Sequence, residues 1–215
     1  MDNFNRSHDD FMQVIAMDAA LLYQRTRALF SLPKSLIPIA PLDDAKEALV
    51  RAFKEGDPQQ IARAIGDGYR RRGLSFLRWC GSGDLFTEAI QVINITGKEY
   101  PESIHWIVTR KPEMVSLLGD YSSFYIMFSL DGTEESMKRK RVVDNINHPR
   151  VYYSYLRQEA DEDTIGAGIV FNLQQKKKLL PYDNKRMTCP VDAGAMTLQG
   201  ACKKCRKCFS PGVYR

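Results

Sequence analysis

Residues 74–131 read LSFLRWCGSGDLFTEAIQVINITGKEYPESIHWIVTRKPEMVSLLGDYSSFYIMFSLD, and this stretch decides the fold class. Three short runs rich in β-branched and aromatic residues predict strands. These runs are 74–80, 103–110 and 124–131. The segments between them predict helices over Thr87–Tyr100 and Pro112–Leu118. Alternation of strands and helices is typical of a parallel sheet with helical crossovers, so we expect an α/β fold.

Two further runs, RVYYSYLR (150–157) and IGAGIVFNL (165–173), extend the predicted sheet to five strands. Two architectures fit this order: a partial parallel β/α barrel and an open parallel sheet. Both place ligand sites at the carboxyl ends of their strands. We therefore look for functional residues directly after the strands.

Helices are predicted before the sheet. Apolar residues recur at three- and four-residue steps over 9–32, and the three prolines of PKSLIPIAP (33–41) predict a linker. Further helices are predicted from Asp43 or Asp44 to Lys54 and from Pro58 to Arg72. The chain thus divides into a helical region, an α/β core and a cysteine-rich segment. The predicted boundaries are 1–72, 73–180 and 181–215.

Composition places the 215-residue chain among ordinary globular proteins, with 44% hydrophobic and 27% charged residues. No apolar run is long enough for a membrane helix, and the polar N-terminus MDNFNRSHDD does not resemble a signal peptide. We expect a cytoplasmic protein without a membrane partner. The net charge is +5, yet residues 176–215 hold ten Lys and Arg against two Asp. This basic tail predicts a nucleic-acid or anionic partner, unless it is simply a solvated surface.

Four of the five cysteines fall in CPVDAGAMTLQGACKKCRKC, residues 189–208. Their spacing is C-x12-C-x2-C-x2-C, in which three thiols come from one tight loop and the fourth from a distant point. This pattern favours a [4Fe–4S] cluster over structural zinc, and a metal-free or disulfide state is the remaining alternative. The predicted ligands are Cys189, Cys202, Cys205 and Cys208.

Basic residues interleave with these cysteines at Lys203, Lys204, Arg206 and Lys207. Four thiolates bring negative charge, which neighbouring cations offset. The same cations also suit a knuckle that contacts nucleic acid, and both interpretations are compatible.

Polar residues follow the predicted strands and form the candidate ligand site. Asp84 either holds a ligand or caps the following helix, and Arg110 either binds a phosphate or carboxylate or forms a structural salt bridge. Asp131 precedes Gly132, where a turn role is favoured. The candidate ligand-binding residues are Ser82, Gly83, Asp84, Thr109, Arg110 and Asp131, with Ser129 expected beside them.

Other reactive residues carry weaker signals. Cys80 is a buried small hydrophobic side chain, a fifth thiol near the cluster or a redox nucleophile. His105 is expected to pack in the core. The phosphate-loop, HExxH and GxSxG signatures are absent from the sequence. The catalytic residues, the substrate and the reaction therefore stay unassigned.

The order of a strand running into Ser-Gly-Asp, a strand ending in Thr-Arg and a terminal cysteine array resembles the phage-associated gene product 88 family. The resemblance covers about residues 73–210, and the family's motif order is similar to the core of radical-SAM barrels. It implies a partial barrel with a C-terminal cysteine cluster. No cysteine precedes Cys80 and no C-x3-C-x2-C triad occurs, whereas the family carries further N-terminal cysteines. The resemblance therefore implies the fold and the cluster, but not radical chemistry.

Two functions follow from these observations. The first is an iron–sulfur protein with an anion or substrate pocket at the strand ends. The second is a nucleic-acid-associated module in which a four-cysteine metal site, zinc or iron–sulfur, organises the basic tail.

Overall fold

A computed structural model describes residues 50–74, 76–79, 84–157, 163, 166–172, 188–191 and 204–209. The predicted helix over 9–32 and the linker over 33–41 lie outside these residues. The chain divides into two compact units, one made of residues 1–73 and 87–100 and the other of 74–86 and 101–215. None of the helices in the described ranges has the length and apolar character needed to cross a membrane.

The first unit contains helices α3 (Pro58–Arg72) and α4 (Thr87–Glu99). α3 has the predicted bounds because its ends carry strong signals. The Asp57 side chain accepts a hydrogen bond from the Gln59 amide at 3.0 Å, and Gly73 ends the helix in the left-handed region. A Cβ atom at Gly66 would lie 2.4 Å from the Tyr100 ring, so only glycine permits this packing.

The second unit is built on a five-stranded sheet in which every neighbouring pair is parallel and the strand order follows the chain. The strands are β1 (Leu77–Trp79), β2 (His105–Thr109), β3 (Phe124–Leu130), β4 (Val151–Arg157) and β5 (Ile169–Asn172). The predicted parallel α/β sheet is confirmed. The strands are shorter than predicted, because residues at the ends of the predicted runs, such as Leu74, Phe76 and Ile104, lie outside the ladder.

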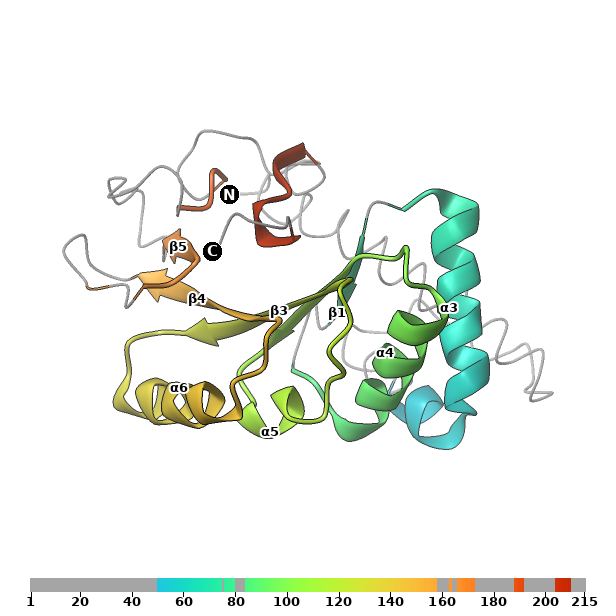
Figure 1. The fold of residues 1–215 in the computed structure, drawn as a ribbon, viewed down its shortest axis with the longest axis horizontal. Helices are drawn as coiled ribbons and strands as arrows, with labels where there is room; N and C mark the ends of the chain where they lie inside the picture. Colours follow the sequence, from blue (N-terminus) through green and yellow to red (C-terminus); the bar gives the residue numbers. More distant parts are fainter. Residues whose placement is uncertain are drawn as a thin grey trace, which may run out of the picture. The chain divides into compact units, whose positions relative to one another are not determined.

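The two faces of the sheet carry different elements (Figure 1). Helices α5 (Pro112–Val115) and α6 (Glu134–Ile146) lie on one face, and the short 3-10 helix η1 (Lys207–Phe209) lies on the other. On the η1 face, Phe209 packs into a buried cluster with side chains from three strands, Trp106, Met127 and Ile169. Burial on both faces is typical of a parallel sheet.

Helix α6 was not among the predicted helices. Its sequence EESMKRKRVVDNI is strongly polar, and only Ser136 and Val143 are buried, so it lacks the apolar stripe that identifies most helices. Other signals mark it. Thr133 caps its N-terminus, and ion pairs four residues apart line its surface, as in Glu134–Lys138 at 2.9 Å.

Candidate functional site

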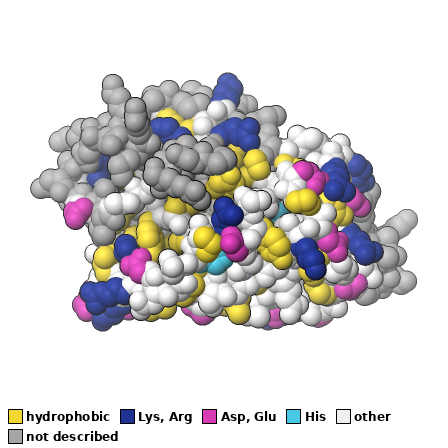
Figure 2. Space-filling view, in the orientation of Figure 1, with side chains coloured by type: hydrophobic (Ala, Val, Ile, Leu, Met, Phe, Trp, Pro, Cys, Tyr) yellow, Lys and Arg dark blue, Asp and Glu magenta, His cyan; other side chains and the backbone are white. Residues whose placement is uncertain are grey.

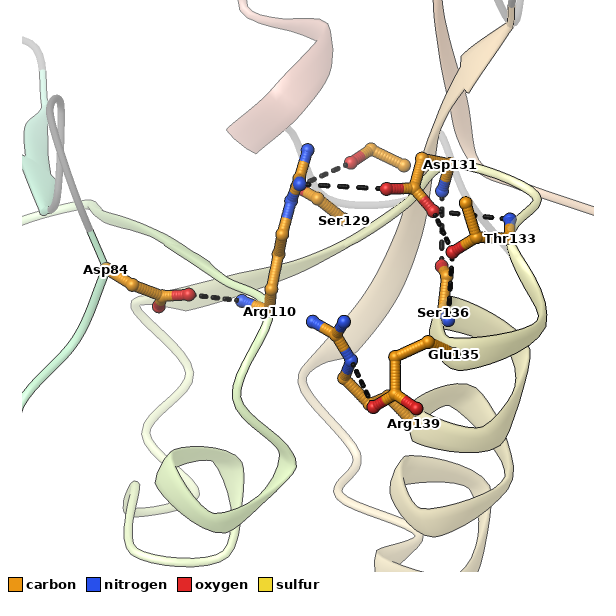
Figure 3. A network of polar contacts seen from close by, with 9 residues as sticks. Asp84, Arg110, Ser129, Asp131, Thr133, Glu135, Ser136 and Arg139 are labelled. Atoms are coloured by element: carbon orange, nitrogen blue, oxygen red, sulfur yellow. Dashed lines mark hydrogen bonds and ion pairs between the residues drawn. The ribbon is translucent and has the colours of Figure 1, made fainter.

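Asp84 ties the segment after β1 to the end of β2. One carboxylate oxygen accepts from the Thr109 hydroxyl at 2.6 Å and from the Leu85 amide at 2.7 Å. The other accepts from the Arg110 amide at 3.0 Å (Figure 3). Thr109 is buried, and its hydroxyl oxygen also accepts from the Lys111 amide at 3.1 Å. Asp84 therefore joins two strand ends, a role that neither the ligand nor the cap interpretation included.

Arg110 extends this network to β3. Its guanidinium lies 3.7 Å from a carboxylate oxygen of Asp131, which directly follows that strand. The Arg110 side chain is 49% exposed, so solvent reaches the guanidinium and the ion pair itself adds little stability. Figure 3 shows the side chain reaching from the end of β2 toward Asp131. Both predicted roles of Arg110 remain open, since an exposed guanidinium retains donors for an anion.

Asp131 begins the turn into α6. It accepts hydrogen bonds from the Thr133 hydroxyl at 2.7 Å and the Thr133 amide at 3.3 Å, which is the predicted turn role. Burial by itself raises the pKa of this carboxyl. The hydrogen bonds from Thr133 and Ser136 and the charge of Arg110 outweigh that effect and hold the pKa below its ordinary value. Asp131 is therefore ionised at neutral pH.

The structure thus brings some of the predicted site residues together at one end of the sheet. Asp84, Thr109, Arg110 and Asp131 form a continuous chain of contacts across the ends of β1, β2 and β3. Ser129 lies beside them and accepts a hydrogen bond from Ser154 at 3.2 Å. Ser82, Gly83 and Cys80 lie outside the described residues. Whether this group binds a ligand stays a prediction.

Two members of this neighbourhood were not predicted. The Lys111 ammonium donates to the Leu85 carbonyl at 2.7 Å and so locks the same two segments as Asp84 does. Ser154 lies inside β4, and its alignment with Ser129 follows from the β3–β4 register. The signal for Lys111 was its place directly after Thr109 and Arg110, whereas Ser154 had none.

A groove opens beside Arg110, between α5 and α6. Its lining combines cations and carboxylates with apolar residues that include Val142 and Ile146. The charged lining residues are Arg110, Lys111, Glu113, Glu135 and Arg139. The Arg139 guanidinium is engaged by Glu135 at 3.2 Å, and Lys111 is held by Leu85. Arg110 is the more exposed of the two arginines that line this groove, at 49% against 37% for Arg139.

The cysteine segment returns to the sheet on the η1 face. Cys189, Cys205 and Cys208 line one pocket, whose walls include Trp106, Ile169 and Phe171. None of these three cysteines forms a disulfide. Cys202 lies outside the described residues. Three of the four predicted metal ligands thus share one pocket.

Backbone contacts hold the cysteines against the sheet. The Cys189 amide donates to the Val170 carbonyl of β5 at 2.8 Å, and Thr188 forms a parallel bridge with the same residue. The Tyr152 hydroxyl of β4 donates to the Cys208 carbonyl. The two halves of the C-x12-C-x2-C-x2-C motif are therefore anchored separately on the same sheet.

The chemistry of this pocket suits a soft metal centre. Thiolates select zinc and iron–sulfur clusters, and Arg206 and Lys207, which also line the pocket, supply positive charge. No group of three potential ligands is already gathered at metal-binding distance among the described residues. The described cysteines therefore provide the donors and the location, while the fourth predicted ligand is not described.

One family model matches the part of the chain that contains the sheet and the cysteines. The model of the family described as gene product 88 matches residues 43–211, which include all five strands and the cysteine array. The chain belongs to the gene product 88 family. The match begins 30 residues before the resemblance recognised in the sequence and so takes in α3 as well. Comparison with curated proteins and with solved structures gave no match.

In this gene product 88 protein, His105 is a core residue, as predicted. It is fully buried in β2; its Nδ1 accepts from the Trp79 indole N–H at 3.0 Å, and its Nε2 lies 2.7 Å from the Ser103 hydroxyl oxygen. Because a tryptophan N–H can only donate, the ring proton must reside on Nε2. Burial lowers the pKa of His105 to about 3.

This buried imidazole predicts acid sensitivity. Below about pH 6.5 His105 is protonated in the unfolded state, whereas in the folded state it stays neutral until the pH falls to about 3. The free energy of unfolding therefore decreases as the pH falls through this window. We expect a loss of about 2 kcal/mol between pH 7 and pH 5 from this group. The His105→Asn variant should be less stable at pH 7 but should lose less on acidification. Urea unfolding of both proteins at the two pH values measures the difference, and parallel losses would contradict the assignment.

Proposed function

We propose that this member of the gene product 88 family is an iron–sulfur protein whose [4Fe–4S] cluster is held by Cys189, Cys202, Cys205 and Cys208. The observation that carries the proposal is the pocket on the η1 face, which three of these cysteines line. Cysteines that served only as small core residues would have no reason to line one shared pocket from two segments 16 or more residues apart.

The choice of iron–sulfur over zinc rests on spacing and surroundings. Structural zinc sites commonly use two separated C-x2-C pairs, whereas here three cysteines follow one another at x2 spacing in the sequence. The apolar walls from Trp106, Ile169 and Phe171 suit a redox centre, because solvent exclusion and local charge tune the potential of a cluster. Zinc remains the alternative metal.

We further propose that the strand ends bind a small anionic ligand in a partial β/α barrel. The sequential order of the five parallel strands is the order found in such barrels, and their carboxyl ends carry the usual ligand site. Arg110 is the proposed anchor, since its guanidinium is half exposed and its backbone is fixed by Asp84. A bound carboxylate or phosphate would compete with Asp131 for this cation.

The proposal is tested by purifying the protein without oxygen and recording its absorption spectrum. A brown protein with a broad visible band, bleached by air or by a reductant, supports an iron–sulfur cluster. A colourless protein that holds stoichiometric zinc would support the zinc alternative and refute the cluster.

A nucleic-acid-associated module is the second candidate, favoured by the exposed side chains of Lys204 and Arg206 next to the cysteines. On the face drawn in Figure 2, the described Lys and Arg side chains lie beside Asp and Glu rather than in one continuous patch. The described part of this face offers no continuous basic surface for a phosphate backbone, so the test is directed at the tail.

The tail is tested by changing Lys203, Lys204, Arg206 and Lys207 together to Gln. If these cations contact phosphates, the variant should bind DNA or RNA more weakly at low salt and with a flatter salt dependence, by up to four released counterions. If they tune the metal centre instead, the reduction potential should shift while nucleic-acid affinity stays the same. A variant unchanged in both respects would identify a solvated surface.

A further inference from the structure

Trp106 has a buried hydrogen-bond donor that nothing in the described residues satisfies. Its side chain is 3% exposed, and its indole N–H is buried without a partner in the described part of the chain. Buried tryptophan N–H groups usually find an acceptor. The same residue forms a wall of the pocket that Cys189, Cys205 and Cys208 line.

The immediate neighbours of the indole offer poor acceptors. The rings of Phe76 and Phe209 lie 6.0 and 5.8 Å from it between centroids, and neither has a lone pair. The guanidinium of Arg78 lies over the indole at 4.5 Å from the centroid, and a guanidinium can only donate. Trp106 also lines the cysteine pocket, where thiolate sulfurs would be strong acceptors.

We propose that the Trp106 indole N–H donates a hydrogen bond to a sulfur of the metal centre and thereby raises its reduction potential. This inference rests on the proposed iron–sulfur function. A hydrogen bond to a cluster sulfur withdraws electron density and stabilises the reduced, more negative state. Trp106 is accordingly a positioning and tuning residue, since it acts on the cluster through a ligand sulfur and not on a substrate.

The test is the Trp106→Phe variant, which keeps an aromatic ring in the core and removes the N–H. We expect unchanged iron and sulfide content and a lower reduction potential. At a fixed applied potential the ratio of reduced to oxidised protein should fall about tenfold, which corresponds to about 59 mV for a one-electron couple. The measurement is a redox titration followed by visible absorption.

Trp79→Phe is a matched control, because the chain has two tryptophans and both are buried. The Trp79 N–H is already satisfied by His105, on the face of the sheet opposite the cysteine pocket. Its removal should destabilise the fold and leave the reduction potential unchanged. Equal potentials in wild type and Trp106→Phe would overturn the inference.

A second measurement covers the case in which the Trp106→Phe variant does not bind the iron–sulfur cluster. In wild-type protein labelled with ¹⁵N-tryptophan, cluster loading should shift the indole N–H signal of Trp106 and leave that of Trp79 in place. An unmoved Trp106 signal would overturn the inference while the cluster stands. Protein without iron would instead refute the proposed function, and this inference with it.

Discussion

Replacing Cys205 with Ser is expected to remove most of the bound metal. Cys205 is the middle cysteine of C-x2-C-x2-C and lines the same pocket as Cys189 and Cys208. A hydroxyl is a poor ligand for iron–sulfur clusters, and metal ligation is coupled to local folding. The variant should therefore lose at least an order of magnitude in metal content and exchange amide hydrogens faster over 204–209.

The sheet should survive this change, because its core does not depend on the cysteines. Ile107, Phe124 and Ile126 are buried within β2 and β3. Cys80→Ser is the matched control, since Cys80 is the one cysteine outside the motif. The control should keep its metal. Wild-type metal content in Cys205→Ser would show that Cys205 is not a ligand.

Replacing Asp84 with Ala is expected to destabilise the sheet unit by about 3 kcal/mol. The substitution removes the acceptor for three donors: the buried Thr109 hydroxyl and the amides of Leu85 and Arg110. Hydrogen bonds to a charged group are each worth about 1.5–3 kcal/mol, and water recovers part of the loss at this partly buried position. Urea unfolding at neutral pH measures the change.

Two comparisons make the result specific. Asp84→Asn keeps one oxygen acceptor but turns an amide donor toward another donor. Its free energy of unfolding should therefore fall between those of the wild type and Asp84→Ala. Asp120→Ala removes an exposed carboxylate that pairs with Arg150 at 2.8 Å, and should cost less than about 1 kcal/mol. Equal effects of Asp84→Ala and Asp120→Ala would refute the role of Asp84 as the junction of the strand ends.

The strands were predictable because their signal is local. Runs such as SIHWIVTR and FYIMFSLD combine β-branched and aromatic residues, and parallel strands are buried on both faces. Helix α6 was missed because its stability comes from capping by Thr133 and from exposed ion pairs, which an apolar periodicity does not detect. Capping residues and charge spacing would have identified it.

The candidate site was predictable in position but not in bonding. Parallel topology alone brings Thr109, Arg110 and Asp131 to one edge. That Asp84 accepts from the Thr109 hydroxyl and the Arg110 amide depends on distances of a few tenths of an ångström, which no sequence pattern encodes. Likewise, the cysteine spacing predicted a metal site, whereas the place of Trp106 in its wall depends on how η1 packs on the sheet.

The most direct test of the account is the iron and acid-labile sulfide content of protein purified without oxygen. The account predicts about four iron and four sulfide per chain, as a [4Fe–4S] cluster on four cysteines requires. One zinc per chain with no sulfide would contradict it.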